Sequence, residues 1–217
     1  MEDIGAVQLI REIASGTRIL TDSELKAVIE HIADAGFDPL ALERARGRAA
    51  GIEWRGRIVR SSDMLPPAEV HYLRHVVAGH EWPDDTDLST FLSSITALIR
   101  DEHSGLLFSS FQGTDQITIV RRSVNLRGPD GFEWVLVDYR LATGHWVTVF
   151  QPHKGLDILQ SPKRSGNRVS RHAASSSPIN PGPRPAWPHR ADTNGRVVTN
   201  GDDDRHDDAR YRRAHGR

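Results

Sequence analysis

The 217-residue sequence contains no cysteine. This absence excludes disulfide bonds, thiolate metal ligands and a cysteine nucleophile. The sequence also lacks a run of about twenty apolar residues, so we expect no membrane-spanning helix and no membrane partner. Residues 1–5 lack the basic and apolar regions of a cleaved signal peptide. These absences predict a protein that stays in the cytoplasm or is secreted without a cleaved signal.

The short motifs of several enzyme classes are absent as well. The sequence has no Gly-x-Gly-x-x-Gly for a dinucleotide and no glycine-rich loop ending in Gly-Lys-Ser/Thr for a nucleotide phosphate. It also has no Gly-x-Ser-x-Gly, the turn that presents the nucleophile of many serine hydrolases. We therefore expect no cofactor.

The formal net charge of −1 is unevenly distributed along the chain. Residues 1–59 carry 8 Lys and Arg against 10 Asp and Glu, residues 60–153 carry 7 against 12, and residues 154–217 carry 13 against 7. Non-specific binding of nucleic acid depends mostly on the neutralisation of phosphates. The acidic middle segment therefore argues against such binding, although it allows a local cationic pocket.

Residues 1–60 are predicted to form a helical module. Apolar residues recur with helical spacing in residues 3–15 and again in residues 25–32, where Thr21-Asp-Ser-Glu24 supplies an N-terminal cap. Asp38-Pro39 is typical of a helix start, so a third helix is expected to reach about residue 50.

Residues 61–153 are predicted to form an α+β domain. One helix begins at Pro67 and ends near Ala78, and a second, strongly amphipathic helix ends at Arg100. Four β-rich runs with short turn-forming connections follow, which predicts an antiparallel meander. The runs are residues 106–112, 116–124, 132–140 and 145–151. The expected fold is thus α+β, with N-terminal helices followed by two helices packed on a four-stranded antiparallel meander.

Residues 154–217 differ in composition from the rest of the chain. They have few apolar residues, no periodicity and polar runs such as Ser175-Ser-Ser-Pro178. Such a composition predicts a disordered C-terminal tail. The arginines of this tail would attract nucleic acid weakly, or the tail would be a solvated segment without function.

Three histidines fall within ten residues at the end of the Pro67 helix. His71 and His75 are four apart and so share a helix face, whereas His80 lies just past Gly79, a natural terminating residue. Histidine titrates near neutral pH, so His75 and His80 could serve as base and acid in one reaction. Ordinary structural hydrogen bonding is the alternative. A zinc site is less favoured, because Arg74 stands beside the pair, and we predict no metal site.

Three strand residues could complete such a site. Thr148 is a hydroxyl in the otherwise apolar last strand, where it could bind an oxyanion or bond within the core. Arg121 and Arg122 point to opposite faces of the second strand, so one of them could bind a phosphate. Arg140, on the third strand, could replace them.

The run His75-Val-Val-Ala-Gly-His80 resembles the His-Ile-x-x-(Gly/Arg)-His signature of the barnase–EndoU–colicin–RelE class of ribonuclease domains, which often form the tips of bacterial toxins. In that class the signature precedes a helix and a four-stranded meander. The last strand resembles the class pattern too, but Gln151 is inserted before Pro152. The resemblance covers roughly residues 64–153.

The resemblance implies a metal-independent endoribonuclease that acts as a toxin. Its substrate would be RNA, with transfer RNA among the candidates, and a cognate inhibitor protein would bind it. His75 and His80 would exchange protons with the 2′-hydroxyl and the leaving 5′-oxygen. Thr148 would bind the phosphate, and Arg121 or Arg122 would stabilise the transition state. The alternative is a non-enzymatic α+β interaction domain with structural histidines, because the acidic core departs from the usual charge of nucleic-acid enzymes.

Overall fold

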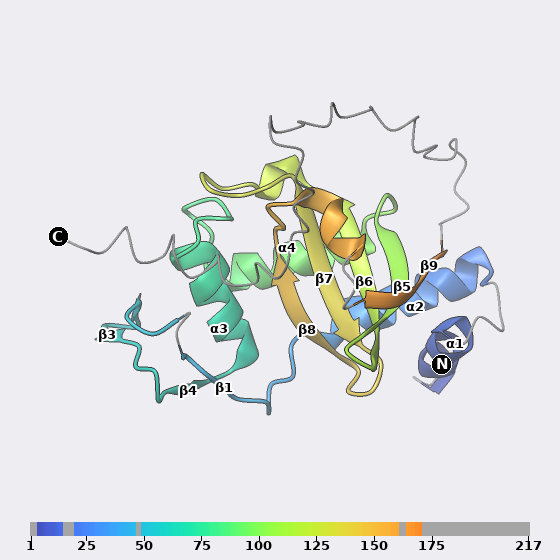
Figure 1. The fold of residues 1–217 in the computed structure, drawn as a ribbon, viewed down its shortest axis with the longest axis horizontal. Coiled ribbons are helices and arrows are strands. Elements are labelled where there is room, and N and C mark those ends of the chain that lie inside the picture. The colour runs from blue at the N-terminus through green and yellow to red at the C-terminus, as the bar shows by residue number, and fades with distance from the viewer. Residues whose placement is uncertain (1–3, 15–19, 47–48, 161–163, 171–217) are drawn as a thin grey trace, which may run out of the picture. The chain divides into compact units, whose positions relative to one another are not determined.

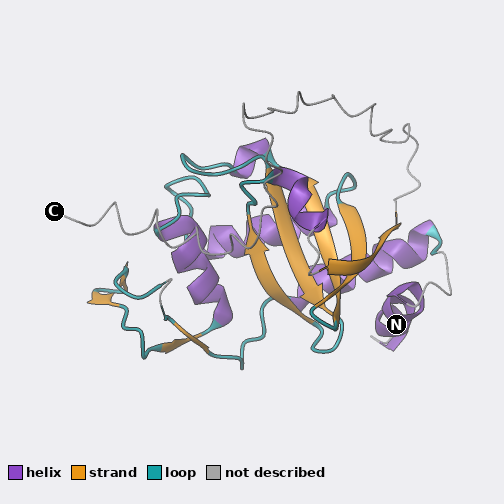
Figure 2. Ribbon diagram, viewed as in Figure 1, coloured by secondary structure: helices purple, strands orange, loops and turns teal. Residues whose placement is uncertain are grey.

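The computed structural model describes residues 4–14, 20–46, 49–160 and 164–170. Figure 1 shows helices α2 and α4 behind a twisted antiparallel sheet, with helix α3 beside the sheet edge formed by β8. Figure 2 separates the helical and strand segments by colour. The predicted α+β fold is confirmed. None of the described helices has both the length and the apolar character needed to cross a membrane.

The first two helices form where helical spacing predicted them, as α1 (Ile4–Ala14) and α2 (Asp22–Ala35). A capping box begins α2, because Glu24 N donates to the Thr21 hydroxyl and the Glu24 carboxylate accepts from Thr21 N at 2.9 Å. The two reciprocal bonds satisfy backbone donors that the first helical turn leaves free. The sequence therefore marks this helix start correctly.

The predicted third helix over residues 38–50 is wrong. The Asp38 carboxylate accepts a hydrogen bond from Leu40 N at 2.9 Å and so stabilises a turn in place of a helix start. Residues beyond this turn form β1 (Glu43–Arg44), which pairs antiparallel with β4 (Met64–Leu65). A tight hairpin, β2 (Glu53–Trp54) and β3 (Arg57–Ile58), lies between them in sequence.

The histidine-rich helix begins at Pro67 as predicted, but it changes its hydrogen-bond pattern midway. Helix α3 (Pro67–Tyr72) continues into a π-helical turn, η1 (Leu73–Val77), where Ala78 N donates to Leu73 O. A π turn is wider than an α turn and is often found at functional sites. Its effect here is to change the direction in which the chain leaves the helix.

Helix α4 (Leu88–Arg100) supplies much of the core. The Asp87 side chain caps it by accepting from Thr90 N at 2.6 Å. Its buried apolar face consists of Phe91, Ile95, Leu98 and Ile99. Full burial of each such side chain contributes about 1.5–3 kcal/mol relative to exposure. Arg100 at its last turn binds Glu30 at 2.7 Å and Asp34 at 2.6 Å, and so ties α4 to α2.

The four predicted strands form one antiparallel meander. They are β5 (Gly105–Phe111), β6 (Thr114–Arg122), β7 (Trp134–Arg140) and β8 (His145–Phe150). The strand order is β8-β7-β6-β5-β9, so a fifth strand, β9 (Arg164–Ser170), adds to the β5 edge. At the other edge, Trp146 N donates to Gly36 O at 2.8 Å, and Phe37 forms a bridge beside Trp146.

Both faces of the sheet bury side chains. Alternate residues such as Ile119 and Val137 join the core beneath the helices, whereas Thr118 and Asp138 are buried on the opposite face. The 3-10 turn η3 (Gly155–Gln160) begins beside Trp134 on that opposite face. The sequence predicted neither η3 nor β9, and the remainder of the predicted tail, residues 161–163 and 171–217, lies outside the described residues.

Candidate functional site

His75 is a buried residue with one strong partner. Its side chain is 8% exposed, and its Nδ1 lies 2.8 Å from Glu81 Oε1. Its Nε2 is closed off from solvent and has no hydrogen-bond partner within the described part of the chain. A general base must come within hydrogen-bond reach of the proton that it removes. In this arrangement Nδ1 of His75 is bonded to Glu81 and Nε2 is buried, so neither ring nitrogen can reach a substrate.

Glu81 connects the helix end to the end of the sheet. Its Oε1 binds His75, and its Oε2 accepts a hydrogen bond from Gln151 N at 3.2 Å. The Gln151 side chain extends the network, because its Nε2 donates to Leu126 O at 2.9 Å and its Oε1 accepts from Phe132 N at 2.7 Å. We call His75, Glu81 and Gln151 the polar clamp. It fastens the histidine helix, strand β8 and the loop after β6 to one another.

The backbone of the loop after β6 is in direct contact with the backbone at the end of the histidine helix. Gly128 N donates to Glu81 O at 2.7 Å, and Asp130 N donates to His80 O at 3.0 Å. A Cβ added at Gly128 would lie 2.0 Å from Trp82 O, and one at Gly131 would lie 2.2 Å from Glu81 O. Only glycine fits at such distances. The loop therefore closes directly over the polar clamp.

His80 differs from His75 because its side chain is exposed to solvent. Its side chain is 53% exposed, and its Nδ1 lies 3.2 Å from Asp84 Oδ1. Its backbone has φ = +46°, a left-handed conformation that costs a non-glycine residue about 1–2 kcal/mol. Gly79 was expected to make this turn, but the left-handed residue is His80. Gly79 is required for space, because a Cβ there would lie 2.6 Å from Arg74 O.

His71 and His75 share a helix face as predicted, and their rings stack at 5.7 Å. The stack continues to Phe37 at 4.9 Å from His71, and Phe37 meets Trp146 edge-on at 5.6 Å. These rings join the helix to the N-terminal segment and to β8, which is a structural role. The described residues contain no group of three or more His, Asp or Glu side chains that could hold a metal ion.

Thr148 lies away from both histidines. Its neighbour Val149 belongs to the core beneath the helices, so Thr148 faces the opposite side of the sheet, where it pairs with Asp138 next to a bulge. Three residues, or about 10 Å of strand, separate it from Gln151, where the polar clamp ends. Arg140 shares the face of Thr148, since it follows Asp138 by two residues, and its Nε is buried without a partner in the described part of the chain.

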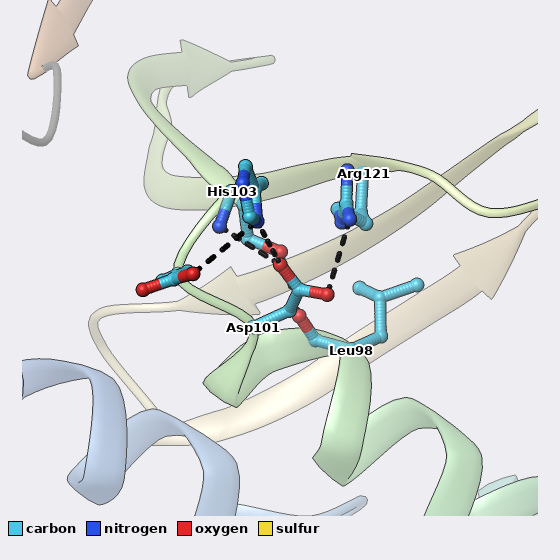
Figure 3. A network of polar contacts seen from close by, with 6 residues as sticks. Leu98, Asp101, His103 and Arg121 are labelled. Carbon is cyan, nitrogen blue, oxygen red and sulfur yellow. Dashed lines mark hydrogen bonds and ion pairs between the residues drawn. The ribbon is translucent and has the colours of Figure 1, made fainter. Parts of the chain in front are cut away.

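The charge of Arg121 is already neutralised at the C-terminal end of α4. Figure 3 shows its guanidinium beside Asp101, with Nη2 and Oδ2 3.1 Å apart, while His103 N donates to the same carboxylate at 2.8 Å. Burial alone would raise the pKa of Asp101. The His103 N–H and the Arg121 guanidinium outweigh that effect and hold the pKa below its usual range.

Arg122 points to the other face, as expected, and binds Glu133 through Nε at 3.1 Å and Nη2 at 3.0 Å. Within the described part of the chain, no contact joins His75 or His80 to Thr148, Arg121 or Arg122. The structure thus brings His75 and His80 to one helix end, but it does not assemble the predicted five residues around a single phosphate.

Sequence reasoning missed the two partners that matter most at this end of the sheet. Glu81 directly follows the histidine run, and Gln151 was noticed only as an insertion before Pro152. No pattern links positions 81 and 151, because their contact joins segments that lie 70 residues apart in the chain. No protein-family model, curated protein or solved structure matches this chain.

Proposed function

We propose that this chain is a non-enzymatic α+β interaction domain in which the histidine run stabilises the fold. The observation that carries the proposal is the polar clamp, in which buried His75 binds Glu81 and Glu81 binds the backbone of Gln151. This contact is explained by stability alone, because a buried polar group such as the His75 ring costs about 1–3 kcal/mol when it has no partner.

The chemistry of the remaining candidates supports the same proposal. Acid–base cleavage of RNA needs two titratable groups and a cation around one phosphate. His75 has no accessible nitrogen, and the guanidinium groups of Arg121 and Arg122 are bound to carboxylates. Of the two candidate histidines, only His80 is exposed. One exposed histidine without an adjacent cation is a poor nuclease site.

A second candidate function is the metal-independent endoribonuclease that the histidine signature implies. The observation in its favour is His80, which is exposed, oriented by Asp84 and held in a left-handed conformation. Such strained residues concentrate at functional sites. In this candidate, His80 takes the proton of a 2′-hydroxyl, that oxygen displaces the 5′-oxygen from phosphorus to form a cyclic phosphate, and solvent water protonates the leaving 5′-oxygen. Thr148 or Arg140 would bind the phosphate only after moving towards His80, because no contact joins them to it in the described part of the chain. Its partners would be RNA and an inhibitor protein.

One experiment separates the two functions. Purified protein is incubated with RNA in EDTA, beside His75→Ala and His80→Ala, and the melting temperature of each protein is measured. The interaction proposal predicts no cleavage by any of them, a melting temperature about 5–10 °C lower for His75→Ala, and no change for His80→Ala. Cleavage that His80→Ala abolishes without a change in melting temperature would establish the ribonuclease in its place.

A further inference from the structure

An open groove lies beside the N-terminal end of α3, and its lining residue Phe37 stacks on His71. It has a volume of about 510 Å³ and is formed by the last turn of α2, the first turn of α3, the middle of α4 and strand β8. Its walls are mostly apolar and include Phe37, Pro66, Leu92 and Trp146. Grooves of this size and character are typical of sites that bind a ligand or an anchoring side chain.

Exposed apolar residues lie close in sequence to the residues that line the groove. Seven large hydrophobic side chains are exposed among the described residues, and three of them, Leu40, Leu42 and Met64, adjoin the groove in sequence. The β1–β4 register pairs Glu43 with Leu65, so continuing it by one residue sets Leu42 opposite Pro66 in the groove wall. Scattered exposed hydrophobic residues are ordinary, but a cluster beside an apolar groove marks an interaction surface.

The charge around the groove is one-sided. Its only charged lining residues are Asp34 and Asp38, and no Lys or Arg lines it. Asp34 Oδ1 binds Arg100, but this one cation is shared with Glu30, and Asp38 Oδ1 accepts from Leu40 N. The second oxygen of each carboxylate has no hydrogen bond within the described residues. Arg44 is a cation near these exposed residues, because it pairs with Met64 and shares the face of Leu42.

We propose that this groove docks a segment of another protein in which a Leu, Phe or Met side chain fills the groove and a neighbouring Lys or Arg meets Asp34 and Asp38. This inference rests on the proposed interaction function and names its surface. The two carboxylates would repel a nucleic-acid phosphate, and they would also meet Asp34 and Asp38 of a second copy unfavourably in a symmetric dimer. A basic partner segment is the occupant that the charges favour.

The groove is separate from the residues that the ribonuclease candidate needs. Ala68 lines the groove in the first turn of α3, whereas His80 lies past the end of η1, at the opposite end of the same helical segment. Substitutions in the groove should therefore leave any chemistry at His80 unaffected.

The test uses random peptides of about twelve residues displayed on phage and selected on the immobilised full-length chain. Enriched sequences should combine Leu, Phe or Met with an adjacent Lys or Arg. A synthetic copy should bind Thr96→Arg at least about tenfold more weakly, because the new cation enters the groove lining. The double variant Asp34→Asn/Asp38→Asn should weaken binding as well, most clearly at low salt. Ala97→Arg adds the same charge on the exposed face of α4 and should bind as the unchanged protein does.

Several outcomes overturn the inference. They are the failure of any peptide to be enriched, enriched peptides without a basic residue, and equal binding by Thr96→Arg and the unchanged protein. A dimer in sedimentation that Thr96→Arg dissociates would assign the groove to a second copy and would overturn it too. RNA cleavage dependent on His80 would instead contradict the proposed function, so the two failures are distinguishable.

Discussion

The two ends of the α3–η1 helix are built in contrasting ways. At its C-terminal end the polar clamp and the Gly128–Gly131 loop close over a buried histidine. At its N-terminal end Pro66 caps the helix without a side-chain hydrogen bond, and the surface beside it is an open apolar groove. The C-terminal end, which is rich in titratable side chains, is thus closed by that loop. The N-terminal end, which has few titratable side chains, is accessible.

The difference teaches that residue chemistry alone is a poor guide to a functional surface. A histidine signals catalysis only where it can reach a substrate, and His75 is bonded to Glu81 beneath a loop. An apolar groove signals binding because exposed apolar area is favourably removed from water when a partner covers it. Three of the four predictions below test this contrast between a closed structural end and an open binding end, and the other tests the ion pair at the end of α4.

The largest effect is expected from Glu81→Ala. The change leaves the buried His75 Nδ1 and the Gln151 N–H without their partner, which should lower the free energy of unfolding by about 2–4 kcal/mol. Urea denaturation measures it. Asp84→Ala is the matched control, because that carboxylate is 71% exposed beside His80, and it should change stability by under about 0.5 kcal/mol. Equal stabilities for the two variants would show that the clamp is not a structural element.

Gly128→Ala should be the next most damaging change. The new Cβ would overlap the carbonyl oxygens of Trp82 and His80, so the loop must move away from the helix end, at a cost of about 1–3 kcal/mol. Gly5→Ala in α1 is the control, since no atom lies within 4 Å of its added Cβ. A melting temperature for Gly128→Ala as high as that of Gly5→Ala would mean that the loop does not close the C-terminal end tightly.

Arg121→Gln should lower the melting temperature by an amount that depends on pH, because Arg121 forms an ion pair with Asp101. Because folding lowers the pKa of Asp101, the stabilisation from its carboxylate is complete above the ordinary value of about 3.9 and disappears as the pH falls through the lower folded value. The melting temperature of Arg121→Gln should therefore fall below that of the unchanged protein at pH 6, and the gap should narrow towards pH 2. A gap independent of pH would contradict the pairing in Figure 3.

The smallest effect on stability is expected at the open end. Thr96→Arg places a long side chain at a half-buried groove position with space around it, so the free energy of unfolding should change by less than about 0.5 kcal/mol, as for Ala97→Arg. Thermal unfolding of both variants measures this. A loss above about 2 kcal/mol for Thr96→Arg alone would indicate that the groove is part of the packed core.

Much of the fold could be predicted from the sequence, because apolar periodicity reports burial directly. The helices that end at Ala35 and Arg100 and all four strands of the meander were found in this way. The predicted third helix failed because the Asp38 side chain stabilises a turn and because β4 pairs with residues 43–44. Pairing with a distant strand leaves no periodic signal in a short segment.

The candidate site was less predictable for a geometric reason. Sequence spacing placed His71 and His75 on one face, which their stacked rings confirm. It could not show that η1 widens into a π turn, that the left-handed residue is His80, or that Thr148 lies on the sheet face opposite Val149. A catalytic role stays a prediction for the five candidate residues, which are His75, His80, Thr148, Arg121 and Arg122.

The short bridge between Phe37 and Trp146 has a consequence for solubility. Strand β8 is an edge of the sheet, and an uncovered edge can recruit strands from other molecules and so start aggregation. Backbone pairing from Gly36 and Phe37 occupies part of that edge. A substitution that detaches this segment, such as Phe37→Asp, should therefore make the protein prone to aggregate at temperatures where its sheet is still folded.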